Sequence, residues 1–147
     1  MISFERLKDI REDNDITQNQ MANILNVKRS TYSLWELGIS IIPLNYLSDF
    51  ADYFNYSIDY VLNLTNIRHT KYLKKGLDLK ALGDNIKRLR MDNELSQENL
   101  ANIIGVTQPA IVRYEKGLVC ISISNLYKLS KEFKVSISYL CDKSNIK

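Results

Sequence analysis

The sequence is poor in the residue types that usually carry catalysis or bind metals. It has one histidine, His69, and two cysteines, Cys120 and Cys141, among 147 residues. It contains no phosphate-binding glycine loop, no paired metal ligands and no nucleophile with a neighbouring histidine. We therefore expect no catalytic residue, no metal site and no cofactor, which argues against an enzyme. The cysteines are expected to remain reduced thiols.

Long apolar runs are also missing. No run approaches the 18 residues that a membrane-spanning helix needs. The first residues, MISFERLKDIRED, carry acids where a signal peptide would have a basic and then an apolar stretch. These two absences predict a protein with no membrane segment and a cytoplasmic location.

An internal repeat is the main positive feature of the chain. Residues 4–62 and 83–141 align without a gap, 79 positions apart, and are identical at seventeen positions. A repeat of about 60 residues is longer than the unit of a solenoid, so we predict two small domains in tandem. We place them at residues 1–64 and 82–147, joined by a basic, partly ordered linker at residues 65–81.

Charge is distributed unevenly between the two repeats. Residues 4–62 carry 5 basic and 9 acidic residues, whereas residues 83–141 carry 8 basic and 6 acidic ones. The second repeat and the linker are thus better suited to a polyanion. Five basic residues of the linker either contact DNA phosphates between the domains or are simply solvated; they are Arg68, His69, Lys71, Lys74 and Lys75.

Apolar residues recur every three or four positions, which favours helices over strands. We predict five helices in the first repeat, at residues 3–13, 18–25, 28–36, 44–54 and 58–63, and the same five 79 residues later. Thr17, Ser96 and Thr107 suit N-caps, whereas Lys28 is a poorer one. Ser57, Ser122, Ser136 and Pro43 mark the remaining starts.

The turn between the second and third helices is alike in both repeats. A small residue, Ala22 or Ala101, precedes by four positions a residue that adopts the left-handed conformation easily, Asn26 or Gly105. A valine that should enter the core follows directly; these valines are Val27 and Val106. This spacing is typical of a helix-turn-helix motif, in which the second helix of the motif faces outward.

The residues of this motif resemble a known family. Residues 95–117, LSQENLANIIGVTQPAIVRYEKG, and the more diverged residues 16–38, ITQNQMANILNVKRSTYSLWELG, resemble the Cro and phage-repressor helix-turn-helix family. The resemblance covers both repeats. It implies an all-α chain of two tandem five-helix, lambda-repressor-like domains, with double-stranded DNA as the ligand and transcriptional control as the usual role.

The resemblance also implies which residues of the second repeat contact DNA. The first turn of helix three enters the major groove, and Gln97 matches the family glutamine that contacts the DNA backbone. The expected DNA-binding residues are Gln97, Thr107, Gln108, Pro109 and Arg113. Gln108 can bond the N6/N7 edge of adenine. Arg113 suits a guanine or a phosphate, although an exposed arginine is often only solvated.

The first repeat has different residues at the matching positions. The expected contacts are Gln18, Lys28, Arg29, Ser30 and Ser33, and two adjacent basic residues in an acidic repeat are consistent with a DNA-facing tip. The alternative is that this repeat has drifted toward protein contacts. Trp35 and Tyr114 occupy the family's aromatic position, where we expect them to pack in the core.

The loop after helix three departs from the family, which usually has polar, often basic residues there. Residues 39–42 read ISII and residues 118–121 read LVCI. Such loops supply little phosphate contact, so we expect them to be buried against the other repeat or a second chain. The predicted interface residues are Ile41, Ile42, Val119 and Ile121.

Two functions remain open at this point. The first is a sequence-specific DNA-binding transcriptional regulator of the repressor type, whose two different tips would bind an asymmetric operator. The second is a protein-binding module, such as an antitoxin or a phage-encoded inhibitor. It would form a homodimer or hold a protein partner through the acidic first repeat.

Overall fold

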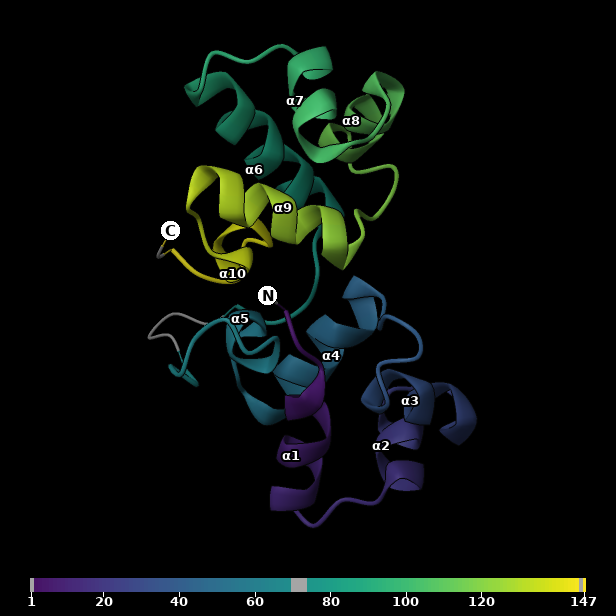
Figure 1. Cartoon of the computed structure of the whole chain (residues 1–147). Helices are drawn as coiled ribbons and strands as arrows, with labels where there is room; N and C mark the ends of the chain where they lie inside the picture. The colour runs from purple at the N-terminus through teal and green to yellow at the C-terminus, as the bar shows by residue number, and fades with distance from the viewer. Residues whose placement is uncertain (1, 70–73, 146) are drawn as a thin grey trace. The chain divides into compact units, whose positions relative to one another are not determined.

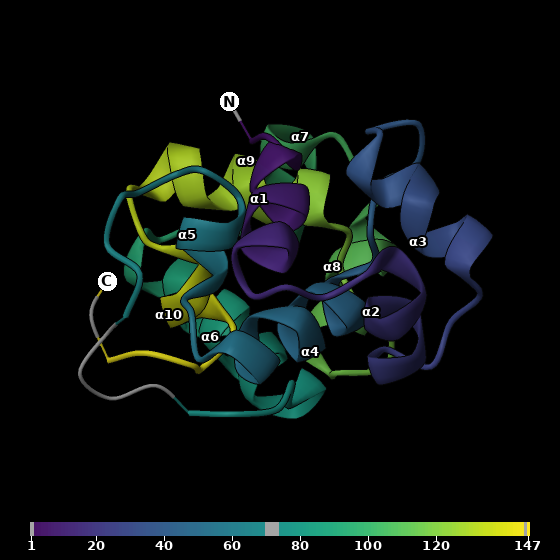
Figure 2. The ribbon, with the colours of Figure 1, turned by 90° about the horizontal axis from the view of Figure 1, so that it is seen from below.

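The computed structural model describes residues 2–69, 74–145 and 147, and within these ranges it is helical without strands. The chain divides into two compact units, residues 1–70 (unit 1) and 71–147 (unit 2) (Figures 1 and 2). Unit 1 contains α1 (Glu5–Asp13), α2 (Gln18–Ile24), α3 (Arg29–Glu36), α4 (Leu44–Phe54) and α5 (Ile58–Val61). Unit 2 contains α6 (Leu79–Asp92), α7 (Gln97–Ile104), α8 (Gln108–Glu115), α9 (Ile123–Phe133) and α10 (Ile137–Leu140). The predicted all-α fold of two five-helix repeats is confirmed.

Side-chain caps fix where most of the helices begin. The Thr17 hydroxyl accepts from the backbone N–H of Gln20, whose side chain accepts in return from the Thr17 N–H. This reciprocal pair satisfies two N–H groups that the first turn of a helix leaves free. Thr107 caps α8 through the N–H of Ala110, whereas Lys28 makes no side-chain cap bond to α3. The predicted difference between these two caps is confirmed.

The turns of the two helix-turn-helix motifs have the same geometry. Asn26 and Gly105 adopt left-handed conformations, with φ of +56° and +73°. The following valine N–H donates back to the helix, from Val27 to the Ala22 oxygen at 2.9 Å and from Val106 to the Ala101 oxygen at 3.0 Å. Both alanines are buried. This geometry holds α3 against α2 and α8 against α7.

Two of the four predicted interface residues belong to the buried core. Ile42 and Ile121 are 0% and 1% exposed, so they offer no surface to a second chain. Each lies directly before the N-cap of α4 or α9, which is the position of a hydrophobic staple that packs on the fifth residue along, Leu47 or Leu126. Ile41 and Val119 are exposed, at 53% and 44%.

The first helix differs between the units. We expected the first helix of the second repeat at residues 82–92, but α6 begins at Leu79 because the Asp78 carboxylate accepts from two N–H groups of its first turn. The added turn lies against the end of α8. A Cβ on Gly83 would fall 2.3 Å from the Tyr114 carbonyl oxygen. The matching position in unit 1 is Phe4, the N-cap of the shorter α1.

The first part of the connecting segment is hydrogen-bonded to unit 1, and its later part is hydrogen-bonded to unit 2. Arg6 in α1 donates to the Thr65 oxygen at 2.6 Å, and the N–H of Ser57 donates to the Arg68 oxygen at 2.8 Å. In unit 2, Lys74 donates from its backbone to the Lys143 oxygen at 3.0 Å. Residues 70–73, which include the basic Lys71, lie outside the described part of the chain.

Candidate nucleic-acid interface

The tip of unit 2 is formed by the starts of α7 and α8. Of the residues predicted to contact DNA there, Thr107, Gln108, Pro109 and Arg113 are exposed. The opposite face of α8 is anchored in the core by the buried Ile111 and Glu115. The helix therefore presents its polar first turn outward, with Arg113 one turn further along.

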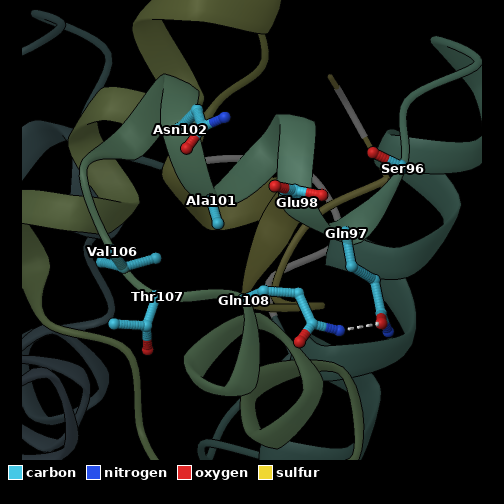
Figure 3. Close-up of a pocket in the computed structure, with 8 residues that line it drawn as sticks. All are labelled: Ser96, Gln97, Glu98, Ala101, Asn102, Val106, Thr107 and Gln108. Atoms are coloured by element: carbon cyan, nitrogen blue, oxygen red, sulfur yellow. Dashed lines mark hydrogen bonds between the residues drawn. The ribbon is translucent and has the colours of Figure 1, made fainter.

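A chain of hydrogen bonds runs from inside unit 2 to this tip. Arg90 in α6 donates to both carboxylate oxygens of Glu115, from Nε at 2.5 Å and from Nη2 at 3.2 Å. Gln97, the first residue of α7, donates from Nε2 to Glu115 Oε2 at 2.9 Å. Gln108 then donates from Nε2 to Gln97 Oε1 at 3.0 Å, and Figure 3 shows the two glutamine side chains meeting between α7 and α8. One buried ion pair thus connects with a surface amide.

Unit 1 repeats the inner part of this network. Arg11 donates to both oxygens of Glu36, and Gln18 donates from Nε2 to Glu36 Oε2 at 2.9 Å. Burial alone would raise the pKa of the Glu36 carboxyl, but the hydrogen bonds from Arg11 and Gln18 outweigh it and lower that pKa below its ordinary value. Glu36 is therefore held as a carboxylate.

The neighbour of this ion pair differs between the units. Unit 1 has Tyr32 where unit 2 has Ile111, and both side chains are buried. Burial, followed by the nearby Glu36 carboxylate, raises the pKa of the Tyr32 hydroxyl. The tyrosine thus stays neutral beside the carboxylate.

The tip of unit 1 is basic rather than amide-rich. Lys28, Arg29 and Ser30 are exposed, and Ser33 on the next turn is half-buried. Arg29 occupies the position that Gln108 has in unit 2. Gln18 corresponds to Gln97 and makes the same bond to the glutamate, but unit 1 has no second glutamine at the start of α3 to extend the chain.

The four charged residues of the two ion pairs were not among the predicted site residues. Arg11 and Arg90 are identical in the repeats, as are Glu36 and Glu115, and each pair spans 25 positions. Their identity in both copies was the available signal. The first repeat is acidic overall and the second is basic. A charged residue that is kept in both therefore has a role other than setting the net charge of its repeat.

A surface groove lies beside each tip. The groove in unit 2 has a volume of about 590 Å³ and runs between the first turns of α7 and α8 (Figure 3). Its lining includes Gln97, Thr107 and Gln108, together with Glu98 and Asn102 from the outer face of α7. The groove in unit 1, of about 770 Å³, lies on the other side of α3, between Lys28 and the loop at Ser40, Ile41 and Pro43.

The aromatic residues of the motif have unequal surroundings. Trp35 is buried and packs on Tyr46, with ring centroids 5.3 Å apart. Tyr114 is half-buried, with its carbonyl oxygen against Gly83. Core packing is thus the role of Trp35, which also lines the groove of unit 1.

Both units expose apolar residues in the loop after the motif. We call the exposed set the apolar loops: Leu37, Ile39 and Ile41 in unit 1, and Leu118 and Val119 in unit 2. Leu37, Ile39 and Leu118 are 67%, 71% and 69% exposed, which is unusual for large aliphatic side chains.

No helix among the described residues is long and apolar enough to span a membrane.

Comparison with known proteins shows relatives among transcriptional regulators. The chain is 35% identical over 57 residues to the uncharacterized HTH-type transcriptional regulator YqaE of Bacillus subtilis, which covers 39% of this chain and 49% of the relative. It is 40% identical over 58 residues to an uncharacterized transcriptional regulator in the ATPase CF(0) region of Rhodospirillum rubrum, covering 40% of this chain and 54% of the relative. The chain thus spans about half the length of these curated relatives.

Solved structures show the same kind of likeness. The P22 c2 repressor in complex with a synthetic operator is 28% identical, with a TM-score of 0.41, over 43% of this chain and 96% of that one. The restriction-modification controller protein C.AhdI from Aeromonas hydrophila is 30% identical, with a TM-score of 0.40, over 43% and 96%.

The family itself follows from a match to each repeat. A helix-turn-helix family model matches residues 7–61 and again residues 86–140, which together make up more than half of the chain. Each match contains all of the α2–α3 or α7–α8 motif. The chain belongs to the helix-turn-helix family of Cro and the phage repressors, and it carries two copies of the family's domain.

Proposed function

We propose that the protein is a sequence-specific, double-stranded DNA-binding transcriptional regulator of the repressor type. The observation that carries this proposal is the exposed tip of unit 2, where Thr107, Gln108 and Arg113 stand clear of a buried scaffold. An amide and a guanidinium on the first two turns of a helix are the groups that bond adenine and guanine edges in the major groove.

Unit 1 supplies the second DNA-binding tip in this proposal. Lys28 and Arg29 are exposed at the start of α3, where their charges favour phosphate and guanine. Because the two tips carry different residues, their half-sites differ and the operator is asymmetric. Two domains in one chain take the place of the two-fold dimer that many repressors form.

Selection from a random duplex library, followed by gel-shift titration at several salt concentrations, tests this function. Gln108→Ala and Arg113→Ala should weaken binding to the selected duplex by about 1–3 kcal/mol each and relax the preference at one base pair. Lys28→Ala should instead weaken all duplexes alike and reduce the salt slope by about 1. If Gln108→Ala and Arg113→Ala both keep the full affinity, unit 2 is not the reader.

A second candidate function has support from the apolar loops. Leu37, Ile39 and Ile41 form an exposed aliphatic set on a unit whose net charge is negative, and such sets are common at protein interfaces. In this reading the apolar loops bind a protein partner or a second copy of the chain, with Ile41 of unit 1 and Val119 of unit 2 at the interface. Mass measurement in solution, with and without a random duplex, separates the two: Ile39→Ser should then abolish a dimer and leave DNA binding by unit 2 intact.

A further inference from the structure

We propose that Glu115 sets the direction in which the Gln108 amide faces DNA, acting through Gln97. Glu115 is then a positioning residue for base recognition, although it is 6% exposed and touches no base itself. This inference rests on the proposed function, because it assigns a control element to the DNA-binding tip of unit 2.

The chemistry of the three groups makes the hydrogen-bonded chain directional. A carboxylate only accepts hydrogen bonds, so the side of the Gln97 amide that meets Glu115 must be its NH₂ group. The Gln97 oxygen then faces outward, and the Gln108 amide can meet it only with its own NH₂ group. Each amide has one favourable orientation, and reversing either would bring two oxygens together. Arg90, paired with the same carboxylate, anchors the inner end.

This orientation has a consequence for the outer side of Gln108. One N–H is used by Gln97, which leaves the Oε1 acceptor and the second N–H for the duplex. These two groups match adenine, which offers an N6 donor and an N7 acceptor in the major groove. An amide released from Gln97 can also turn its whole NH₂ group toward the O6 and N7 acceptors of guanine. The bonded chain therefore favours adenine over guanine at this base pair.

Unit 1 provides an internal control for the idea. Its ion pair and first glutamine are the same, since Gln18 donates to the Glu36 carboxylate as Gln97 does to Glu115. The residue at the position of Gln108 is Arg29, whose guanidinium has donors only and no direction to set. Changing Glu36 thus disturbs an equivalent buried pair and its bond from Gln18, but it alters no amide at the position of Gln108.

The test compares base preference in variants of the full chain. The duplex selected by the wild-type chain is made with adenine or guanine at the base pair where Gln108→Ala loses its preference. Glu115→Gln and Gln97→Met should each reduce the adenine-to-guanine affinity ratio by about 2- to 10-fold, the effect of freeing one side chain that was ordered before binding. Glu36→Gln should leave the ratio unchanged. A purely structural role for Glu115 would lower both affinities and keep the ratio.

The outcomes distinguish this inference from the proposed function. Gln97→Met leaves the Arg90–Glu115 pair in place, so it decides the matter if Glu115→Gln fails to fold. A ratio within twofold of the wild type in Gln97→Met overturns the inference while the DNA-binding function stands. If the wild-type chain enriches no sequence, the proposed function fails. NMR relaxation of the Gln108 side-chain amide then tests the bonded chain alone: mobility equal in the wild type and in Gln97→Met overturns it.

Discussion

The two units share an inner framework and differ at its edges. Both place an arginine from the first helix and a glutamine from the second on one glutamate at the end of the third, with matching distances. The tip carries Lys28 and Arg29 in unit 1 and Thr107 and Gln108 in unit 2. The buried part thus sets where the third helix stands, and the exposed part is free to change. Comparing two copies in one chain thus distinguishes the residues that position the third helix from those that form its exposed surface.

The units also differ in how the first helix covers the motif. In unit 2, α6 has 14 residues and reaches the end of α8, whereas α1 has nine residues. Gly117 consequently lies under Leu79, while Gly38 at the matching position has open space around it. The added turn packs against the end of α8 in unit 2 only.

The largest effect is expected from breaking the shared ion pair. Glu36→Ala leaves the buried Arg11 guanidinium with only the exposed Glu12 carboxylate, 3.7 Å away, as a charged partner. The loss should cost unit 1 about 3–5 kcal/mol. Trp35 is the single tryptophan of the chain and lies in unit 1, so its fluorescence during urea unfolding reports on that unit alone. Glu115→Ala should leave the Trp35 transition in place. Circular dichroism reports on the helices of both units, and only the part of its signal that comes from unit 2 should shift.

A double variant is the control for this prediction. Arg11→Met combined with Glu36→Leu removes both charges, so it should recover most of the stability lost in Glu36→Ala. If Glu36→Ala and Glu115→Ala each lower the free energy of unfolding by less than about 1 kcal/mol, the ion pairs are not part of the common framework.

Substitution of the two glycines after the motif tests how tightly the longer α6 packs against the rest of unit 2. Gly38 and Gly117 both have a φ of +69°, so replacing either by alanine costs about 1–2 kcal/mol for the left-handed backbone. In Gly117→Ala the new Cβ also falls 2.9 Å from the Leu79 oxygen, which should cost about 1–3 kcal/mol more. Unfolding of both variants by urea checks the difference. Equal losses would show that α6 can yield without cost.

Exchanging the caps should produce opposite changes of about 1 kcal/mol each. Lys28→Thr gives α3 the side-chain cap that it lacks, so the Trp35 transition should move to higher urea concentration. Thr107→Lys removes the bond to the Ala110 N–H and should destabilise unit 2. Thr107→Ser retains the hydroxyl and serves as the control. A stable Thr107→Lys variant would contradict the assignment of the cap.

The smallest expected effect is on the pH dependence of the stability of unit 1, through protonation of Glu36. Because the pKa of Glu36 is lowered in the folded chain, its carboxylate stabilises unit 1 above the ordinary carboxyl pKa of 4.5, and this contribution is lost as the pH falls through the folded-state value. Glu36→Gln should remove this part of the acid sensitivity of the Trp35 transition. Asp9→Asn, at an exposed carboxylate of α1, is the comparison. A pH dependence that is the same in Glu36→Gln and the wild type would rule out the carboxylate as its source.

Much of the fold could be predicted because its signals are local. Thr17, Ser96 and Thr107 cap the helices that follow them, and Asn26 and Gly105 end the helices before them, since these roles depend on neighbours within a few residues. The start of α6 was predicted too late for a related reason. The repeat alignment transferred the bounds of α1, whereas Asp78 is a cap with no counterpart in unit 1.

The candidate site was less predictable because it depends on packing. The contact of Arg90 with Glu115 joins residues 25 positions apart, and only the folded unit brings their side chains together. Ile42 and Ile121 were wrong as interface residues because the staple position turns them inward, whereas adjacent Ile41 and Val119 stay exposed. Contact of Gln108 and Arg29 with DNA remains a prediction.

One carboxylate in unit 2 holds three helices at once. Glu115 ends α8 and accepts from Arg90 of α6 and from Gln97 at the start of α7. If any of these helices frays at that point, the same buried charge loses a partner, so partial opening is penalised from every direction. The three helices should therefore exchange their amide protons as a single cooperative block, and the tip should stay rigid until the whole unit unfolds.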